Sequence, residues 1–157
     1  MKFLEAGRNQ FLEIATLPAS AEELYLVYPS GHYPWSVEQL DKLYETRREF
    51  TVAVINGSVA AFANLYNVIP GKSAFIGNVI VADAYKGKGV GRALTGHMIR
   101  ICTEKYGAAA HISVFGFNAR AILMYASMGF TPYAVEARKN IAGESVALFH
   151  LCQSTEK

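Results

Sequence analysis

A glycine-rich loop with basic side chains is the part of this chain best suited to bind an anion. It follows an apolar, β-branched run and precedes a stretch with helical periodicity. Glycines let the backbone turn sharply and bring N–H groups close to a ligand. A helix that begins there adds unpaired amides and the positive end of its dipole, so we expect the loop to hold a phosphate or pyrophosphate. Its residues are Lys86, Gly87, Lys88, Gly89, Val90, Gly91 and Arg92.

Two common nucleotide-binding motifs do not match the spacing of these glycines. The phosphate-binding loop of nucleoside triphosphatases needs a Ser or Thr after its lysine to ligate Mg²⁺, whereas Gly89 follows Lys88 here. The dinucleotide fingerprint needs Gly-x-Gly-x-x-Gly and an acidic residue about 20 positions later. Here the spacing is Gly-x-Gly-x-Gly, and the strand expected at 109–115 ends without an acid. Neither kind of nucleotide site is therefore predicted.

A second motif lies downstream, where Asn118 opens a predicted helix that carries Tyr125 and stops before Gly129 and Phe130. This segment is similar to a signature of the GNAT superfamily of N-acetyltransferases, in which Asn is followed by a helical Tyr and then Gly-Phe. The glycine loop resembles the other signature of that superfamily, Arg/Gln-x-x-Gly-x-Gly/Ala, with Lys86 in the first position. The resemblance implies a GNAT fold and acetyl-coenzyme A (acetyl-CoA) as the cofactor.

The resemblance also implies a role for each matched position. The backbone of strand residues Val79, Ile80 and Val81 would bind the pantetheine arm, the N–H groups of 86–92 would hold the pyrophosphate, and Asn118 would contact the cofactor. Asn78, at an expected bulge, is a catalytic candidate, and a strand N–H near Val79 would polarise the thioester carbonyl. Tyr125 would protonate the departing thiolate.

The general base is open at this stage. Ser113 occupies the position at which ribosomal-protein N-terminal acetyltransferases of the superfamily carry a Glu. His111 lies two residues earlier on the same face of the predicted strand and is the candidate to relay a proton through water. Loss of the amine proton to solvent along a water chain is the alternative.

The acceptor is expected to be the primary amine of a small molecule, because Ser113 replaces the glutamate of the N-terminal acetyltransferases. The aromatic segment 25–35 matches the region that forms one wall of the acceptor pocket in the superfamily. Two alternatives are acetylation of a protein or peptide N-terminus and a non-catalytic acyl-CoA sensor. The candidate substrate contacts are Tyr25, Tyr28, His32, Tyr33 and Trp35.

Each of these residues also has a purely structural explanation. The glycine loop could be a tight turn into a helix. Asn118 is a good helix N-cap, and Tyr125 shares the apolar spacing of its helix. His111 and His150 are predicted on strands, where a histidine is more often a hydrogen-bonded residue than a catalyst.

The elements that position these residues follow from periodicity and turn signals. Asn56-Gly57 is a strong hairpin signal, and Ser36 with Gln39 resembles a capping box. We expect an α/β fold with a mixed central sheet of about seven strands and about four helices, splayed between strands 74–82 and 109–115. The other strands are predicted at 10–15, 50–55, 58–68, 133–139 and 144–151, and the helices at 18–28, from Ser36 over Leu43, after the glycine loop and at 118–128.

Composition narrows the class of protein. The chain has 157 residues, of which 52% are hydrophobic and 18% charged, so it is expected to fold as a single N-acetyltransferase domain over 1–157. A formal charge of +2 gives no reason to expect nucleic-acid binding. No membrane span, signal peptide or metal cluster is predicted. Cys102 and Cys152 are expected to be free thiols, the protein to be cytoplasmic, and a homodimer to be possible.

Overall fold

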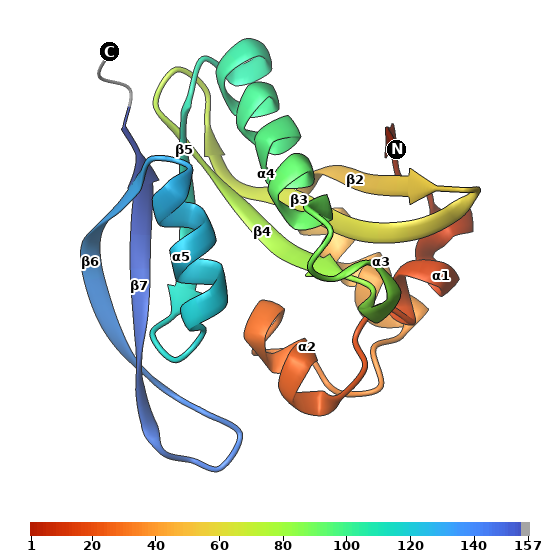
Figure 1. Ribbon diagram of the computed structural model, residues 1–157, viewed down its shortest axis with the longest axis horizontal. Helices are drawn as coiled ribbons and strands as arrows, with labels where there is room; N and C mark the ends of the chain where they lie inside the picture. The colour runs from red at the N-terminus through yellow and green to blue at the C-terminus, as the bar shows by residue number, and fades with distance from the viewer. Residues whose placement is uncertain (155–157) are drawn as a thin grey trace.

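The computed structural model describes residues 1–154, which form one seven-stranded mixed sheet with helices on both faces (Figure 1). The strands lie in the order β1-β2-β3-β4-β5-β7-β6, and β4 and β5 form the parallel pair. The expected α/β architecture is confirmed. The strands are β1 Lys2–Glu5, β2 Arg48–Ile55, β3 Ser58–Ile69, β4 Ser73–Val81, β5 Ala109–Phe115, β6 Phe130–Lys139 and β7 Ser145–Gln153; the helices are α1 Phe11–Ala15, α2 Ala21–Val27, α3 Val37–Thr46, α4 Val90–Arg100 and α5 Ala119–Ser127.

The first predicted strand is wrong, because residues 10–15 are helical and the first strand lies at Lys2–Glu5. In α1, Phe11 and Ile14 are three residues apart and both are buried, which is the spacing of one helix face. The segment is short, and its apolar residues fit both the helical and the strand periodicity. Packing against neighbouring elements determines which of the two forms. Residues 1–154 therefore contain five α-helices, one more than the roughly four that the sequence predicted.

The next two helices begin at serine caps. The side chain of Ser20 accepts a hydrogen bond from the Glu23 N–H, and that of Ser36 accepts one from the Gln39 N–H. The Gln39 amide does not complete a capping box with the Ser36 backbone. It instead accepts from the N–H of His32 at 2.9 Å and donates to the His32 carbonyl at 3.0 Å. The segment between α2 and α3 is thereby held against α3.

The parallel strands β4 and β5 separate after only four residue pairs. Their register runs from Ser73–Ala109 to Ile76–Ile112, and beyond Ile76 the two strands diverge. A bulge begins at the same point, because Asn64 of β3 pairs with Gly77 whereas Phe62 pairs with Ile80. The predicted splay and bulge are therefore present, and the main chain of β4 after Ile76 has an edge that does not pair with β5.

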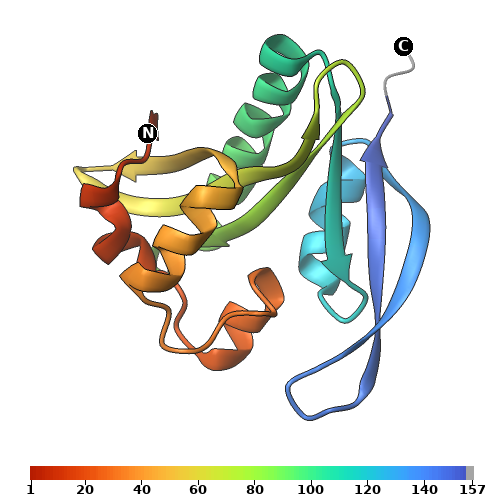
Figure 2. The same cartoon turned by 180° about the vertical axis from the view of Figure 1, so that it is seen from behind.

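Helices on the two faces of the sheet cover separate cores. Helices α4 and α5 pack over one face, and α1, α2 and α3 cover the other, as the opposite views show (Figures 1 and 2). The α4 side is built from Leu94, Met98 and Cys102 with sheet residues, and the α3 side from aromatic residues such as Phe50 and Phe62. The α4-side core spans the splay, with buried residues such as Ile76 of β4 and Ile112 of β5, whereas the buried sheet residues of the α3-side core come from β2, β3 and β4.

Three expectations from composition concern membrane spans, metal sites and the two cysteines. In the part of the chain that the structure describes, no helix is long and apolar enough to cross a membrane. Across residues 1–154, no group of three or more His, Cys, Asp or Glu side chains is placed to hold a metal ion. Cys102 and Cys152 are free, and burial raises the pKa of the Cys102 thiol to about 11, which makes it a weak nucleophile.

Candidate active site

Two cavities meet where β4 and β5 diverge. The glycine-loop groove, of about 520 Å³, lies between α2, the end of β4, the glycine loop and α5. The sheet cavity, of about 420 Å³, lies between the end of α2, strands β3 to β5 and the β6–β7 hairpin. Six residues line both spaces, so the cavities adjoin along this shared wall: Leu26, Val27, Val79, Asn118, Ala121 and Tyr125.

The glycine loop presents free main-chain amides to its groove. Gly89 is the N-cap of α4 with φ +81°, a left-handed conformation that favours glycine, and no side chain caps the helix. The first main-chain hydrogen bond of the helix runs from the Ala93 N–H to the Gly89 carbonyl. A Cβ at Gly89 would meet nothing within 4 Å, so the space above it is open. This arrangement fits the pyrophosphate expected there.

The basic side chains around the loop differ in whether they already form ion pairs with the protein. Lys86 forms ion pairs with Glu23 at 2.8 Å and Asp83 at 2.6 Å. Burial lowers the pKa of Lys86, but hydrogen bonds to these two acids outweigh it and leave the pKa raised. Its charge therefore ties the loop to α2. Arg120 of α5 also lines the groove and approaches within 3.3 Å of a Cβ built at Gly87, a cationic contribution that the sequence analysis missed.

The open edge of β4 forms the wall of the groove. Val79 and Val81 pack partly buried against the α4 side of the sheet, whereas the Ile80 side chain is only 3% exposed and belongs to the opposite core. Ile80 can therefore contribute only its main chain to a ligand in the groove. The unpaired edge offers N–H and C=O groups to an extended ligand, as an added strand would use them.

Tyr125 lies at the junction of the two cavities. Its side chain is 6% exposed, lines both spaces, and makes no hydrogen bond to another residue of 1–154. Burial raises the pKa of Tyr125 to about 12. The hydroxyl therefore keeps its proton at neutral pH and is available as a donor. Asn118 lines both cavities too, while its side chain accepts from the Ala121 N–H and caps α5.

The side chain of Asn78, a residue that lines the sheet cavity, makes three hydrogen bonds. Asn78 has φ +52°, its Oδ1 accepts hydrogen bonds from Arg47 at 2.8 Å and Asn64 at 2.8 Å, and its Nδ2 donates to the Val27 carbonyl at 2.7 Å. These bonds hold the bulge and the end of α2 in place. The geometry gives the Asn78 side chain a positioning role.

A hydrogen-bonded chain of three residues lines the sheet cavity. Ser113 and His150 are directly paired across β5 and β7, and the Ser113 Oγ lies 2.7 Å from His150 Nδ1. His150 Nε2 lies 2.6 Å from Glu136 Oε2 on β6. The hydrogen bond from His150 is the main cause that lowers the pKa of Glu136, which therefore stays ionised at neutral pH. Sequence reasoning missed this group because its members lie on three strands.

His111, the base suggested by the sequence, lies outside the wall of the sheet cavity. Its Nδ1 is 2.8 Å from the Tyr133 hydroxyl, and its Nε2 is 3.6 Å from the Cys152 sulfur. Burial, followed by the charge of His150, lowers the pKa of His111, which favours its neutral form. It remains close to Ser113 along β5 but has its own partners.

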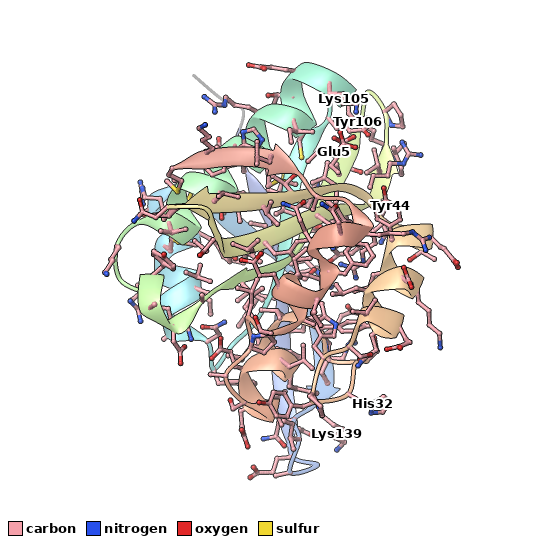
Figure 3. The ribbon with its side chains drawn as sticks, turned by 90° about the vertical axis from the view of Figure 1, so that its right-hand side faces the viewer. Glu5, His32, Tyr44, Lys105, Tyr106 and Lys139 are labelled. Atoms are coloured by element: carbon pink, nitrogen blue, oxygen red, sulfur yellow. The ribbon has the colours of Figure 1, made fainter. Side chains whose placement is uncertain are left out.

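The aromatic segment before α3 contributes unevenly. Tyr28 lines the sheet cavity, whereas Trp35 is 4% exposed and packs against Tyr28 and Phe62 in the core. His32 and Tyr33 are exposed and line neither cavity, and His32 lies at the periphery of the molecule (Figure 3). Tyr25 stacks on Phe115 across the splay with ring centroids 5.2 Å apart. Tyr28 is thus the one member of the set that the structure places on a cavity wall.

Comparisons with known proteins agree with this geometry. The model of the acetyltransferase (GNAT) family matches residues 14–130. The chain is 32% identical over 120 residues to the [ribosomal protein bS18]-alanine N-acetyltransferase of Escherichia coli. The aligned residues make up 76% of this chain and 77% of the relative.

Solved structures share the fold. The ribosomal-protein-S18-alanine N-acetyltransferase from Escherichia coli aligns with a TM-score of 0.77 and 23% identity over 99% of this chain and 96% of that chain. The yncA protein from Salmonella typhimurium, determined with its cofactor acetyl-CoA, aligns with a TM-score of 0.79 and 20% identity over 100% and 95% of the two chains. With a glycine loop and a strand edge that suit an acyl carrier, and relatives that are N-acetyltransferases, the chain belongs to the GNAT family of acetyltransferases.

Proposed function

We propose that this chain, as one domain over 1–157, transfers acetyl directly from acetyl-CoA to the primary amine of a small molecule in the cytoplasm. The observation that carries the proposal is the pair of cavities that meet at Tyr125, one with free main-chain amides and one with an acid–base group. Acetyl-CoA supplies an acetyl group already activated as a thioester.

The carrier would be held mainly by backbone. The amides of Gly89, Val90 and Gly91 would bind the pyrophosphate, with Arg92 and Arg120 adding positive charge from the groove wall. Lys88 does not line the groove, and its Nζ lies 5.9 Å from the centroid of the Tyr85 ring. The β5-facing edge of 79–81 would bind the pantetheine arm, and a main-chain N–H near Val79 would donate to the carbonyl oxygen.

The proton of the attacking amine would leave through Ser113 and His150. With Glu136 ionised, a neutral His150 would donate a hydrogen bond from Nε2 to Glu136. Its Nδ1 would then accept a hydrogen bond from the Ser113 hydroxyl. The amine proton then passes to Ser113 Oγ as the hydroxyl proton passes to His150, and Glu136 stabilises the imidazolium. His111 with a water, or release of the proton to solvent, is the alternative route.

Tyr125 would donate a proton to the departing sulfur. A thiol ordinarily titrates near 8.5, well below the raised pKa of Tyr125, so donation in water would be unfavourable. The burial that raises the pKa of Tyr125 also raises the pKa of a thiol formed beside it. The difference between the two pKa values is therefore smaller in the site than in water.

A small acceptor suits the size of the sheet cavity. Its volume of about 420 Å³ is typical of small-molecule sites, and the segment Leu26–Ser30 and the β6–β7 hairpin both contribute walls. A peptide N-terminus is the second candidate, because the Escherichia coli relative is an alanine N-acetyltransferase of a ribosomal protein.

The test measures release of free CoA thiol from acetyl-CoA with panels of small amines and of peptides. We expect turnover with at least one class of small amine and binding of acetyl-CoA by calorimetry. Turnover with peptides alone would replace the acceptor by a protein N-terminus. Binding of acetyl-CoA without turnover on either panel would favour the non-catalytic sensor.

A further inference from the structure

Arg47 extends from the C-terminal end of α3 into the floor of the sheet cavity. One guanidinium nitrogen, Nη1, donates to Asn64 Oδ1 at 3.1 Å and to Asn78 Oδ1 at 2.8 Å. The guanidinium lies over the Tyr66 ring, 4.3 Å from its centroid. A Cβ at Gly77 would sit 2.4 Å from Nη1, so the absence of a side chain at this position is what admits the arginine. The guanidinium is therefore held in a fixed place.

The charge of Arg47 has no acidic counterpart among residues 1–154. Within the described part of the chain, no carboxylate lies within 4 Å of its nitrogens. The other charged side chains of the cavity wall are Arg138 and Glu136, which pair with each other at 3.1 Å, and Glu136 also meets His150. Burial is the largest influence on the pKa of Arg47 and lowers it. A half-buried cation without a counter-ion favours an anionic ligand.

The remaining donors of Arg47 suit a carboxylate. Both hydrogen bonds to protein use Nη1, so across residues 1–154 the Nη2 and Nε groups have no hydrogen-bond partner. An arginine presents such donors as a planar fork that matches the two oxygens of a carboxylate. Arg47 lines the sheet cavity and does not line the glycine-loop groove, so its ligand is the acceptor rather than the phosphates of the carrier.

We propose that Arg47 binds a carboxylate on the acceptor, and that the acceptor class is therefore amino acids and related amines that carry a carboxylate. This inference rests on the proposed function of the same site. It separates amino acids from peptide N-termini, in which a neutral amide replaces the α-carboxylate, and from polyamines, which carry no carboxylate.

The experiment compares each amino acid of a panel with its own carboxamide, which keeps the amine and the side chain and removes the charge. The readout is kcat/KM from CoA thiol release. We expect a preference for the acids of about tenfold to a hundredfold. An amide analogue has the less basic amine and hence more of the neutral nucleophile at a given pH, so chemistry alone would favour the amide.

Three variants assign this preference to one residue. R47Q should bring acids and amides to similar kcat/KM, and R47K should keep part of the preference. R48Q is the matched control, because Arg48 is the exposed neighbour that contacts Tyr106 and lines neither cavity. It should retain the preference in full. Thermal unfolding of each variant shows whether it is folded.

Titration calorimetry with the wild-type protein and the same acid–amide pairs provides a readout that needs neither turnover nor a variant. Tighter binding of the acids supports the inference even if no amine is acetylated, in which case the proposed function fails alone. Equal binding, or equal kcat/KM, for acids and amides overturns the role of Arg47 while acetylation of the neutral amines leaves the proposed function standing.

Discussion

The glycine-loop groove and the sheet cavity share a wall but are built in different ways. Much of the groove comes from one continuous stretch, the end of β4, the loop and the start of α4, and it presents main-chain groups. The sheet cavity draws side chains from β3, β4, β5, β6 and β7 and from the ends of α2 and α3. One space is suited to recognise a common carrier through its backbone, and the other to select an acceptor through side chains.

The difference separates affinity for the carrier from choice of acceptor. Backbone amides are present whatever the side chains are, provided that the glycines keep their conformation. The proposed acceptor side depends on Arg47, Ser113, Glu136 and His150, all of which line the sheet cavity and none of which lines the groove. Changes on one side should therefore leave the other nearly intact, and variants can test that separation.

The largest effect is expected from His150→Gln, which removes the proposed base on the acceptor side. Its kcat/KM should fall by about a hundredfold or more, while the affinity for acetyl-CoA stays unchanged. His111→Gln is the matched control: if it loses activity and His150→Gln does not, the base is His111.

The converse change is Gly89→Ala on the carrier side. The new Cβ would occupy the open space above the loop at φ +81°, so affinity for acetyl-CoA should fall about tenfold or more in calorimetry. Gly57→Ala is the control, since Gly57 also has φ +79° and open space but lies in the β2–β3 turn. Both should lose about 1 kcal/mol of stability. Unchanged affinity in Gly89→Ala would contradict the loop assignment.

Tyr125→Phe probes the shared wall. Removal of the hydroxyl should lower kcat about tenfold or more, with little change in the binding of either substrate, because the proton donor acts only as the sulfur leaves. The ring still fills its place against Phe130. Full activity in this variant would leave Tyr125 as a core residue.

The smallest effect concerns an ion pair outside both cavities. Burial alone would raise the pKa of Glu49, but hydrogen bonds from Lys105 Nζ at 2.7 Å and the Tyr106 hydroxyl at 2.6 Å outweigh it and leave the pKa lowered. Figure 3 shows Lys105 and Tyr106 near each other. The contribution of ionised Glu49 to folding stability is therefore fully present above the pKa of Glu49 in the unfolded chain. It is lost as the pH falls through the lower pKa of Glu49 in the folded protein.

Glu49→Gln should accordingly be less stable than wild type at pH 7, with the difference vanishing in acid, as measured by urea unfolding at several pH values. Acetyl-CoA affinity and kcat/KM should not change. Glu45→Gln is the control, because Glu45 is exposed and forms no ion pair within residues 1–154. A pH-independent loss in Glu49→Gln would exclude this linkage.

Sequence reasoning predicted most elements because their signals are local. The Asn56-Gly57 hairpin and the caps at Ser36 and Asn118 depend on a few adjacent residues, and so does the glycine loop. The segment 10–15 was misassigned because its burial depends on elements far along the chain. Of the aromatic residues at 28–35, periodicity could not tell that Trp35 is in the core and Tyr28 on a cavity wall.

By itself the sequence predicted where an acyl carrier would bind, because the proposed site is a continuous run of backbone whose conformation its own glycines permit. Only the tertiary structure decided which side chains surround the sheet cavity, the proposed acceptor site. Arg47, Ser113, Glu136 and His150 lie on separate elements and meet through strand register and a bulge in β4. The spacing of these residues along the chain does not indicate that they line one cavity. They come together because strands that are distant in sequence pair through hydrogen bonds.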